Sequence, residues 1–263
     1  MDRRAFCYLA AAVTADAGAR LLDPFDTFTC SLIAPLKKRR DIFFEAREYA
    51  SAYSLYMRLR RLQSVVGYGN FNIIDFDYAL TIGRHYTNVG EFRDDEIEVF
   101  EKLFYFNADE YGFFGEKVIT DMTVRFDRNK MYKVPHTGHF LYKSESLGHY
   151  ETIRKKIGGS IILTSGVRGI VKQMYLFLNK TFQLNGNLSL ASHSLAPAGY
   201  SYHGVGDFDV GKVGFGVKNF TREFENTDEF KRLMDLGFVK IRYYDNNPFG
   251  VRYEPWHIKV VKG

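Results

Sequence analysis

Apolar residues in the first half of the chain recur at intervals near 3.6, a spacing that predicts amphipathic helices. The first helix is expected over residues 44–66 and ends at the turn-forming run Gly67-Tyr68-Gly69-Asn70. A second helix, capped by Asp75 or Asp77, extends to His85, and a third covers residues 95–111. These helices lie in a predicted helical N-terminal region at 41–134, which is expected only to pack against the rest of the chain. The alternative is a wall-binding or substrate-shaping module.

The pattern changes after residue 158. Residues 160–164 form a short apolar run typical of a buried strand, and the turn Ser165-Gly166 leads into a helix with apolar residues through position 182. Thr227 begins a further helix that is ended by Gly237. Residues 239–244 and 251–261 predict two strands joined by a turn. Residues 135–263 are therefore expected to form an α+β domain.

Composition indicates a globular chain whose hydrophobic residues, 46% of the total, are enough for a core. No apolar run reaches eighteen residues, so we expect no transmembrane span. The two cysteines, Cys7 and Cys30, both precede the predicted helices. A metal bound in the body of the protein would therefore have nitrogen and oxygen ligands.

The net charge of +5 favours anionic partners. Basic residues are dispersed, except for the run Lys37-Lys38-Arg39-Arg40. No nucleic-acid-binding motif accompanies that run, so we expect no nucleic-acid partner. An anionic cell-wall polymer fits the charge equally well.

The N-terminal segment has the outline of an export signal. A charged start with Arg3-Arg4-Ala5-Phe6, similar to a twin-arginine motif, precedes an apolar stretch and the small residues Ala15 and Ala17. We predict a signal peptide at 1–17, a linker at 18–40, and export to the periplasm or cell wall. The alternative is a short amphipathic helix that stays on the protein.

Two histidines and several carboxylates near the C-terminus suggest a catalytic zinc site. Such a site takes three His, Asp or Glu ligands, leaves a position for water, and places a further carboxylate as general base. His203, Asp209 and His257 suit the ligand roles and Glu254 the base role. Asp207 shares a strand face with Asp209, so one of them would bind metal while the other orients a histidine. Spacing alone leaves this open, because His and Asp are common in cores and turns.

Arg168 is predicted near the start of a helix, where a cation is electrostatically disfavoured. Such a position suggests a task, for example gripping a carboxylate. The alternative is an ordinary surface arginine. By contrast, His136 and His139 lie in a turn-forming run, where a surface or supporting role is favoured over metal binding.

Three separated segments resemble those of the VanY-like D-alanyl-D-alanine carboxypeptidases, zinc peptidases of the Hedgehog/DD-peptidase superfamily. Ser165-Gly166-Val167-Arg168, with Gln173, is similar to S-G-Y-R…Q. Residues 197–206, PAGYSYHGVG, are similar to P-x-G-x-S-x-H-x-x-G. Glu254-Pro255-Trp256-His257 is similar to E-x-W-H. The segments follow the family's order and lie near its spacing.

The resemblance implies a small antiparallel sheet flanked by helices and a full set of site residues. It implies that zinc binds His203, Asp209 and His257, that Glu254 is the general base and that Arg168 contacts substrate and the developing oxyanion. Substrate contacts are implied for Gln173, Ser201 and Trp256. One departure concerns the aspartate, because His203 and Asp209 enclose one residue fewer than is usual in the family. Asp209-Val210-Gly211 matches the family's ending, and Asp207 is the alternative.

The implied activity is zinc-dependent removal of a terminal D-amino acid from peptidoglycan stem peptides, by a protein expected to be a monomer. A peptidoglycan endopeptidase of the same fold is one alternative. A non-catalytic cell-wall-binding protein is another, although Glu254 argues against it, since a binding module needs no general base.

Overall fold

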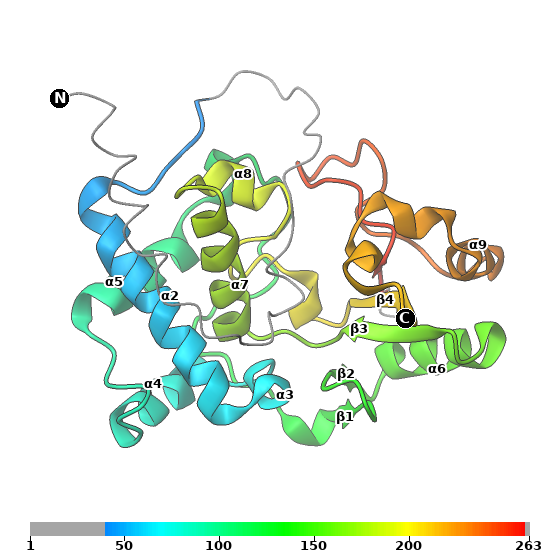
Figure 1. Ribbon diagram of the computed structural model, residues 1–263, viewed down its shortest axis with the longest axis horizontal. Coiled ribbons are helices and arrows are strands. Elements are labelled where there is room, and N and C mark those ends of the chain that lie inside the picture. Colours follow the sequence, from blue (N-terminus) through cyan, green and yellow to red (C-terminus); the bar gives the residue numbers. More distant parts are fainter. Residues whose placement is uncertain (1–39, 261–263) are drawn as a thin grey trace. The chain divides into compact units, whose positions relative to one another are not determined.

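The helical N-terminal region begins with the long helix α2 (Ala46–Val66) in this computed structural model, which describes residues 40–260 (Figure 1). The short α3 (Tyr68–Phe71), α4 (Phe76–His85) and α5 (Asp94–Tyr105) follow. The first two predicted helices are confirmed, and Asp75 caps α4 by accepting a hydrogen bond from Tyr78 N–H. The third is shorter than predicted, because Asn107 caps a separate 3-10 helix, η2 (Ala108–Tyr111).

The core of this region is built from helices distant in sequence. Helix α7 (Ile170–Gln183) packs against α2, and α2 also packs against α5. Large side chains that are fully buried in this cluster are Leu55, Leu59, Leu62, Phe100, Phe104 and Phe177. Burying each such side chain contributes about 1.5–3 kcal/mol. Because the segment containing Arg168 leads directly into α7, this core holds the start of α7 in place.

A three-stranded antiparallel sheet forms the second half, in the order β3 (Ile161–Ser165), β4 (Phe208–Lys212) and β5 (His257–Ile258). The strand predicted at 160–164 is thereby confirmed. In the register, Asp209 pairs with Ser165 on one side and with His257 on the other. The sheet thus brings together three positions that lie far apart in sequence.

The two strands predicted at 239–244 and 251–261 are wrong in extent. Only β5 and an isolated bridge between Ile241 and Ile258 form within the described part of these ranges. Asn246 and Gly250, in the segment that connects the two ranges, both adopt positive φ, at 58° and 73°. Pro255 has no N–H to donate to a neighbouring strand, and a turn follows Glu254, as expected for this proline.

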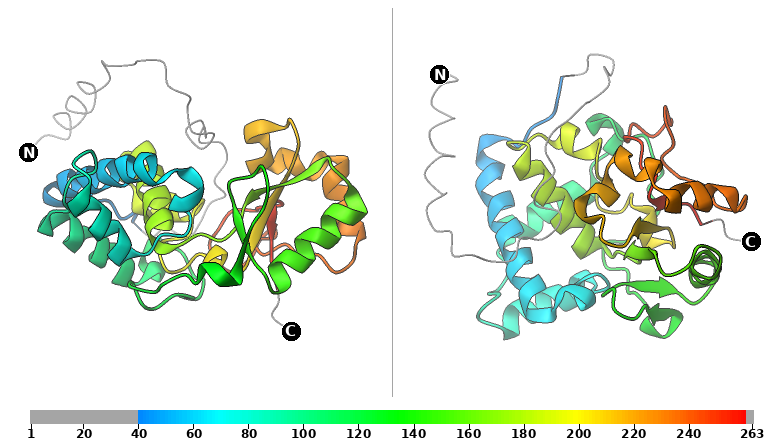
Figure 2. Two further views of the ribbon diagram at one scale, coloured as in Figure 1. Left: turned by 90° about the horizontal axis from the view of Figure 1, so that it is seen from below. Right: turned by 45° about the vertical axis from the view of Figure 1, so that its right-hand side comes forward.

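Shorter elements surround the sheets. β1 (Met131–Lys133) and β2 (Phe140–Tyr142) form a separate antiparallel pair. Helix α6 (Glu145–Ile157), which apolar periodicity does not predict, packs against β3, and α9 (Asp228–Asp235) packs against α6 (Figure 2). The remaining helices are α8 (Leu188–Ser192), η3 (Arg128–Lys130), η4 (Tyr202–Gly204), η5 (Gly216–Phe220) and η6 (Arg222–Asn226). The predicted α+β class, with a small antiparallel sheet flanked by helices after a helical region, is confirmed.

The predicted signal peptide at 1–17, both cysteines and nearly all of the predicted linker at 18–40 lie outside the described residues. Within residues 40–260, each helix is too short or too polar to cross a bilayer.

Candidate metal centre

Asp209 on β4 is the centre of a buried polar cluster. The sheet register places His257 beside it, and His203 comes from η4. His203 Nδ1 lies 2.9 Å from the carbonyl oxygen of Gly166, which leaves Nε2 facing Asp209 Oδ2 at 3.3 Å. Gly166 is needed for this packing, because a Cβ there would lie 2.1 Å from the carbonyl oxygen of Phe140.

His203, Asp209 and His257 each offer a ligand atom, and these atoms lie within 4.8 Å of one another. His257 Nδ1 is 3.2 Å from Asp209 Oδ1, and all three residues are buried. Asp209 Oδ1 is buried without a hydrogen-bond partner among the described residues. A buried carboxylate oxygen is costly to leave unsatisfied. Two imidazoles and one unsatisfied carboxylate oxygen therefore fit the ligand set of a zinc ion.

Burial and the nearby Arg168 lower the pKa of His203 to about 4, so this imidazole is neutral at neutral pH and available as a ligand. Burial acts to raise the pKa of Asp209, but the nearby His203 and His257 hold it well below its usual value. For His257, burial acts to lower the pKa, yet the carboxylates of Asp207 and Asp209 raise it to about 9. A metal ion bound to His257 would displace the proton that the imidazole otherwise carries at neutral pH.

Asp207 lies outside this three-residue group and has other partners. Both of its oxygens accept from the guanidinium of Arg242, and Oδ1 also accepts from Val260 N–H at 2.9 Å. Asp207 Oδ2 lies 3.0 Å from His257 Nε2, on the side of the ring away from Asp209. The two aspartates thus contact opposite ring nitrogens of the same histidine.

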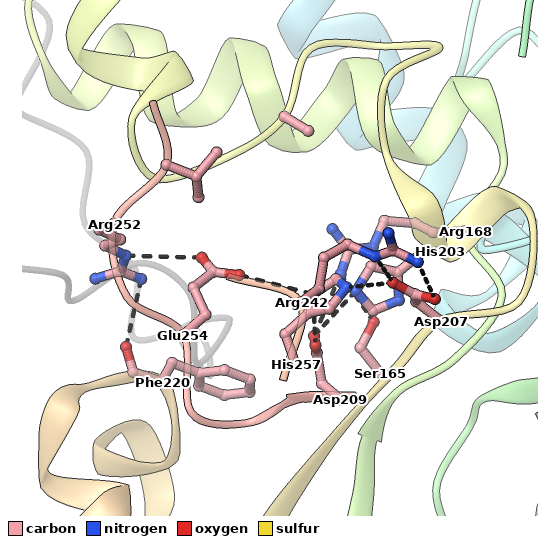
Figure 3. Close-up of polar contacts among 12 residues, drawn as sticks. Ser165, Arg168, His203, Asp207, Asp209, Phe220, Arg242, Arg252, Glu254 and His257 are labelled. Atoms are coloured by element: carbon pink, nitrogen blue, oxygen red, sulfur yellow. Dashed lines mark hydrogen bonds and ion pairs between the residues drawn. The ribbon is translucent and has the colours of Figure 1, made fainter. Parts of the chain in front are cut away.

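Arg168 is buried, with 8% of its surface exposed, so the alternative of a surface arginine is wrong. Its guanidinium donates to Ser165 Oγ at 3.0 Å and to Gln173 Oε1 at 3.1 Å, and lies 3.5 Å from Asp209 Oδ2 (Figure 3). Gln173 Nε2 in turn donates to the carbonyl oxygen of Ala196. Two neutral side chains therefore fix the orientation of a cation beside the cluster.

Glu254 approaches the cluster from another side, between Arg252 and His257 (Figure 3). Its Oε2 lies 3.7 Å from His257 Nδ1, and its Oε1 lies 3.8 Å from Arg252 Nε. Burial raises the pKa of Glu254 to about 7, and Asp209 adds to the shift, while Arg252, His257 and Arg168 oppose it. A carboxyl with this pKa can take up and release a proton near neutral pH.

The remaining site candidates from the sequence lie outside the set of contacts described above. Ser201 is buried at the start of η4, two residues before His203. Trp256 is 3% exposed and packs edge-on against Phe220, with Arg252 near its ring. His139 Nδ1 lies 3.4 Å from Asn72 Nδ2, and His136 is exposed at positive φ. Neither belongs to the metal-ligand group of residues 40–260, which consists of His203, Asp209 and His257.

Two functional candidates are not evident from the sequence. Ser165 is predicted only as part of a motif, yet its hydroxyl accepts from Arg168. Arg242 is predicted on a strand without a functional role, yet it binds Asp207. The one sequence signal for a role of Arg242 is that it is charged and lies within the strand-like run from Val239 to Tyr244. Many exposed strand positions share that feature.

Asp209 and His257 on the sheet, His203 on η4 and a separate carboxyl of raised pKa beside them match the composition of a metallopeptidase-type site. Residues 145–262 match the family model "VanY: D-alanyl-D-alanine carboxypeptidase". This match confirms, over residues 145–262, the resemblance to the VanY-like D,D-carboxypeptidases that the three sequence segments predicted.

Two solved structures are also similar. One is a point mutant of the vancomycin resistance D,D-pentapeptidase VanY from a VanB-type resistance cassette, in complex with Zn(II). Its identity is 20% over 50% of this chain and 78% of that chain, with a TM-score of 0.38. The other is VanYB in complex with D-alanine-D-alanine, at 22% identity over 50% and 77%, with a TM-score of 0.37. No curated protein matches the chain. The resemblance to the family rests on residues 145–262.

Proposed function

We propose that this protein is a zinc-dependent D,D-carboxypeptidase that releases the terminal D-alanine of peptidoglycan stem peptides. The observation that carries the proposal is the unsatisfied oxygen of Asp209, buried between His203 and His257 in a domain that matches the VanY family model. Most buried carboxylate oxygens in structural ion-pair clusters have a hydrogen-bond partner, so an oxygen without one between two histidines favours a metal site.

His203 Nε2, Asp209 and His257 Nδ1 would hold the zinc ion, and Asp207 would not. Zinc bound there supplies a Lewis acid, which polarises a carbonyl and lowers the pKa of water. Glu254 accepts the proton of the attacking water and passes it to the leaving amine. Its pKa of about 7 suits both directions of transfer, because the carboxyl is neither strongly acidic nor permanently protonated.

Arg168 is the cation that faces the scissile carbonyl in this proposal. Ser165 and Gln173 hold its guanidinium in a buried site, so it is already oriented when negative charge develops on the carbonyl oxygen. Gln173 and Ser201 line the substrate site, and Trp256 supports it. The substrate lies outside the cell membrane, so the proposal includes export, with residues 1–17 as signal peptide. The division into 41–134 and 135–263 also stays a prediction.

The direct test combines metal analysis with product analysis. The purified protein is loaded with zinc and incubated with pentapeptide and tetrapeptide stems, and the released species are identified by mass. The expected result is about one zinc ion per chain and free D-alanine from the pentapeptide. Release of a dipeptide without free D-alanine would favour the endopeptidase alternative. Stem binding without any hydrolysis would favour the non-catalytic alternative.

A further inference from the structure

Arg242 and Asp207 form a buried ion pair directly behind His257. The guanidinium donates from Nε to Asp207 Oδ2 and from Nη2 to Oδ1 at 2.9 Å, so the contact is bidentate. Arg242 and Asp207 are 8% and 1% exposed. Bidentate arginine–carboxylate pairs fix geometry as well as charge.

Asp207 connects this pair to the predicted zinc ligand. Its Oδ2 lies 3.0 Å from His257 Nε2, whereas His257 Nδ1 faces Asp209. A neutral imidazole that donates from Nε2 must carry its lone pair on Nδ1. The carboxylate of Asp207 therefore selects the tautomer whose free nitrogen points at the metal-ligand group.

Arg242 also holds the backbone of the same histidine. Its own N–H donates to the carbonyl oxygen of His257 at 3.1 Å, and its guanidinium lies 3.6 Å from the ring centroid of Tyr202. Arg242 is thus connected to His257 at the main chain and, through Asp207, at the ring. Tyr202 is next to His203, so the arginine touches the segments that supply two of the three proposed ligands.

The same contacts explain why Asp207 is not a ligand itself. Hydrogen bonds from Arg242, Val260 N–H and His257 occupy both of its oxygens, whereas Asp209 Oδ1 has no such partner within residues 40–260. Without Arg242, Asp207 would keep only its contacts with Val260 N–H and His257, so its carboxylate would be held less firmly.

We propose that Arg242 and Asp207 act as a positioning pair that holds His257 with Nδ1 toward zinc. The proposal rests on the proposed zinc site and adds two residues that act through a ligand and contact neither substrate nor metal. Partners of this kind typically change metal affinity about 10–100-fold when they are removed.

The primary test measures zinc affinity by competition with a chelator for the wild-type protein and three variants. Asp207→Asn keeps the size of the side chain but removes the carboxylate, and it should weaken zinc binding about 10–100-fold. Arg242→Gln should weaken it about 10-fold or more, and Arg242→Lys should lie between Arg242→Gln and wild type. Circular dichroism of each metal-free variant establishes that it is folded.

Arg222→Gln is the matched control. Arg222 forms a bidentate pair with Asp245, but that pair is exposed and shares no residue with the metal-ligand group or its partners. Its removal should leave zinc affinity unchanged. Loss of zinc affinity in this control as large as in Arg242→Gln would show that the effect is general destabilisation, and would overturn the proposal.

A second measurement needs no variant. Long-range proton–nitrogen correlation spectra of the zinc-loaded wild-type protein should show His257 protonated at Nε2. Zinc bound at Nε2 would refute the positioning role, and so would a folded Asp207→Asn protein with wild-type zinc affinity. Both results leave the zinc site intact, whereas a wild-type protein that binds no zinc would refute the proposed function together with this inference.

Discussion

The protein contains two buried clusters of charged residues that differ in how completely their hydrogen bonds are satisfied. In the helical region, Glu96 accepts from Arg58 Nε at 2.6 Å, from Ser54 Oγ at 2.6 Å and from Arg93 N–H at 3.0 Å. Its side chain is completely buried, and both oxygens have partners. In the sheet region, Asp209 lies among Arg168, His203 and His257, yet its Oδ1 accepts no hydrogen bond from the described residues.

The difference separates a structural cluster from a functional one. A buried charge is tolerated when it is paired and hydrogen-bonded, and the Arg58–Glu96 pair meets that condition within the protein. Asp209 is also paired with nearby cations, but its buried Oδ1 accepts no hydrogen bond within residues 40–260 and so can serve as a metal ligand. Charge and burial are similar in the two clusters, so neither property alone would have distinguished them.

The largest expected effect is on catalysis and concerns Glu254. Glu254→Gln removes the proton acceptor but keeps the size of the side chain, so kcat/KM on a pentapeptide stem should fall about 10²–10⁴-fold. Zinc content should stay at the wild-type level, because Glu254 is not among the three ligands. Steady-state kinetics and metal analysis on the same sample test both statements. Hydrolysis at the wild-type rate would refute the assigned role.

Much of this site was predictable, because its residues lie in short local motifs. The segments around Arg168, His203 and His257 each carry a recognisable spacing, and helices such as α2 follow from apolar periodicity. The choice between Asp207 and Asp209 as the metal ligand was open from the sequence. It depends on the pairing of β4 with β5 and on Arg242, which reaches Asp207 from 35 positions away.

The failed predictions have similar causes. The residues from 239 to 261 have strand-like composition, but within their described part only β5 and the bridge between Ile241 and Ile258 form. Sequence patterns report the preference of a segment for strand or helix, not whether a neighbouring strand is available to pair with it.

The second prediction sets the two clusters against each other. Glu96→Ala leaves Arg58 buried without its carboxylate, and should lower the free energy of unfolding by about 3–5 kcal/mol. Its zinc affinity should be unchanged wherever the protein is folded. Asp209→Ala should abolish tight zinc binding while costing the metal-free protein less stability than Glu96→Ala. Chemical denaturation and chelator competition measure the two properties, and equal stability losses would mean that both clusters are structural.

The third prediction concerns the acid side of the pH profile. Glu254 acts as a base only when it is ionised, so kcat/KM should fall about tenfold per pH unit below its pKa. Burial raises the pKa of Glu254 to about 7, and a bound zinc ion would lower it again. The inflection should therefore lie between the ordinary glutamate value of about 4.3 and about 7. Zinc content measured at each pH excludes metal loss, and a rate that stays flat from about pH 8 to about pH 4 would contradict the role of Glu254.

The smallest expected effect is on stability, and it has the opposite sign to the catalytic one. A carboxyl whose pKa rises from about 4.3 in the unfolded chain to about 7 on folding binds more protons in the folded state, so stability falls as pH rises through that window. Glutamine stays neutral. Metal-free Glu254→Gln should therefore be about 1–3 kcal/mol more stable than the wild-type protein at about pH 8, and equal to it at about pH 4. Thermal unfolding at the two pH values measures the difference. A gain in stability of the same size at both pH values would indicate improved packing. A gain confined to the higher pH would show that the fold tolerates a costly ionised Glu254 beside His203, Asp209 and His257.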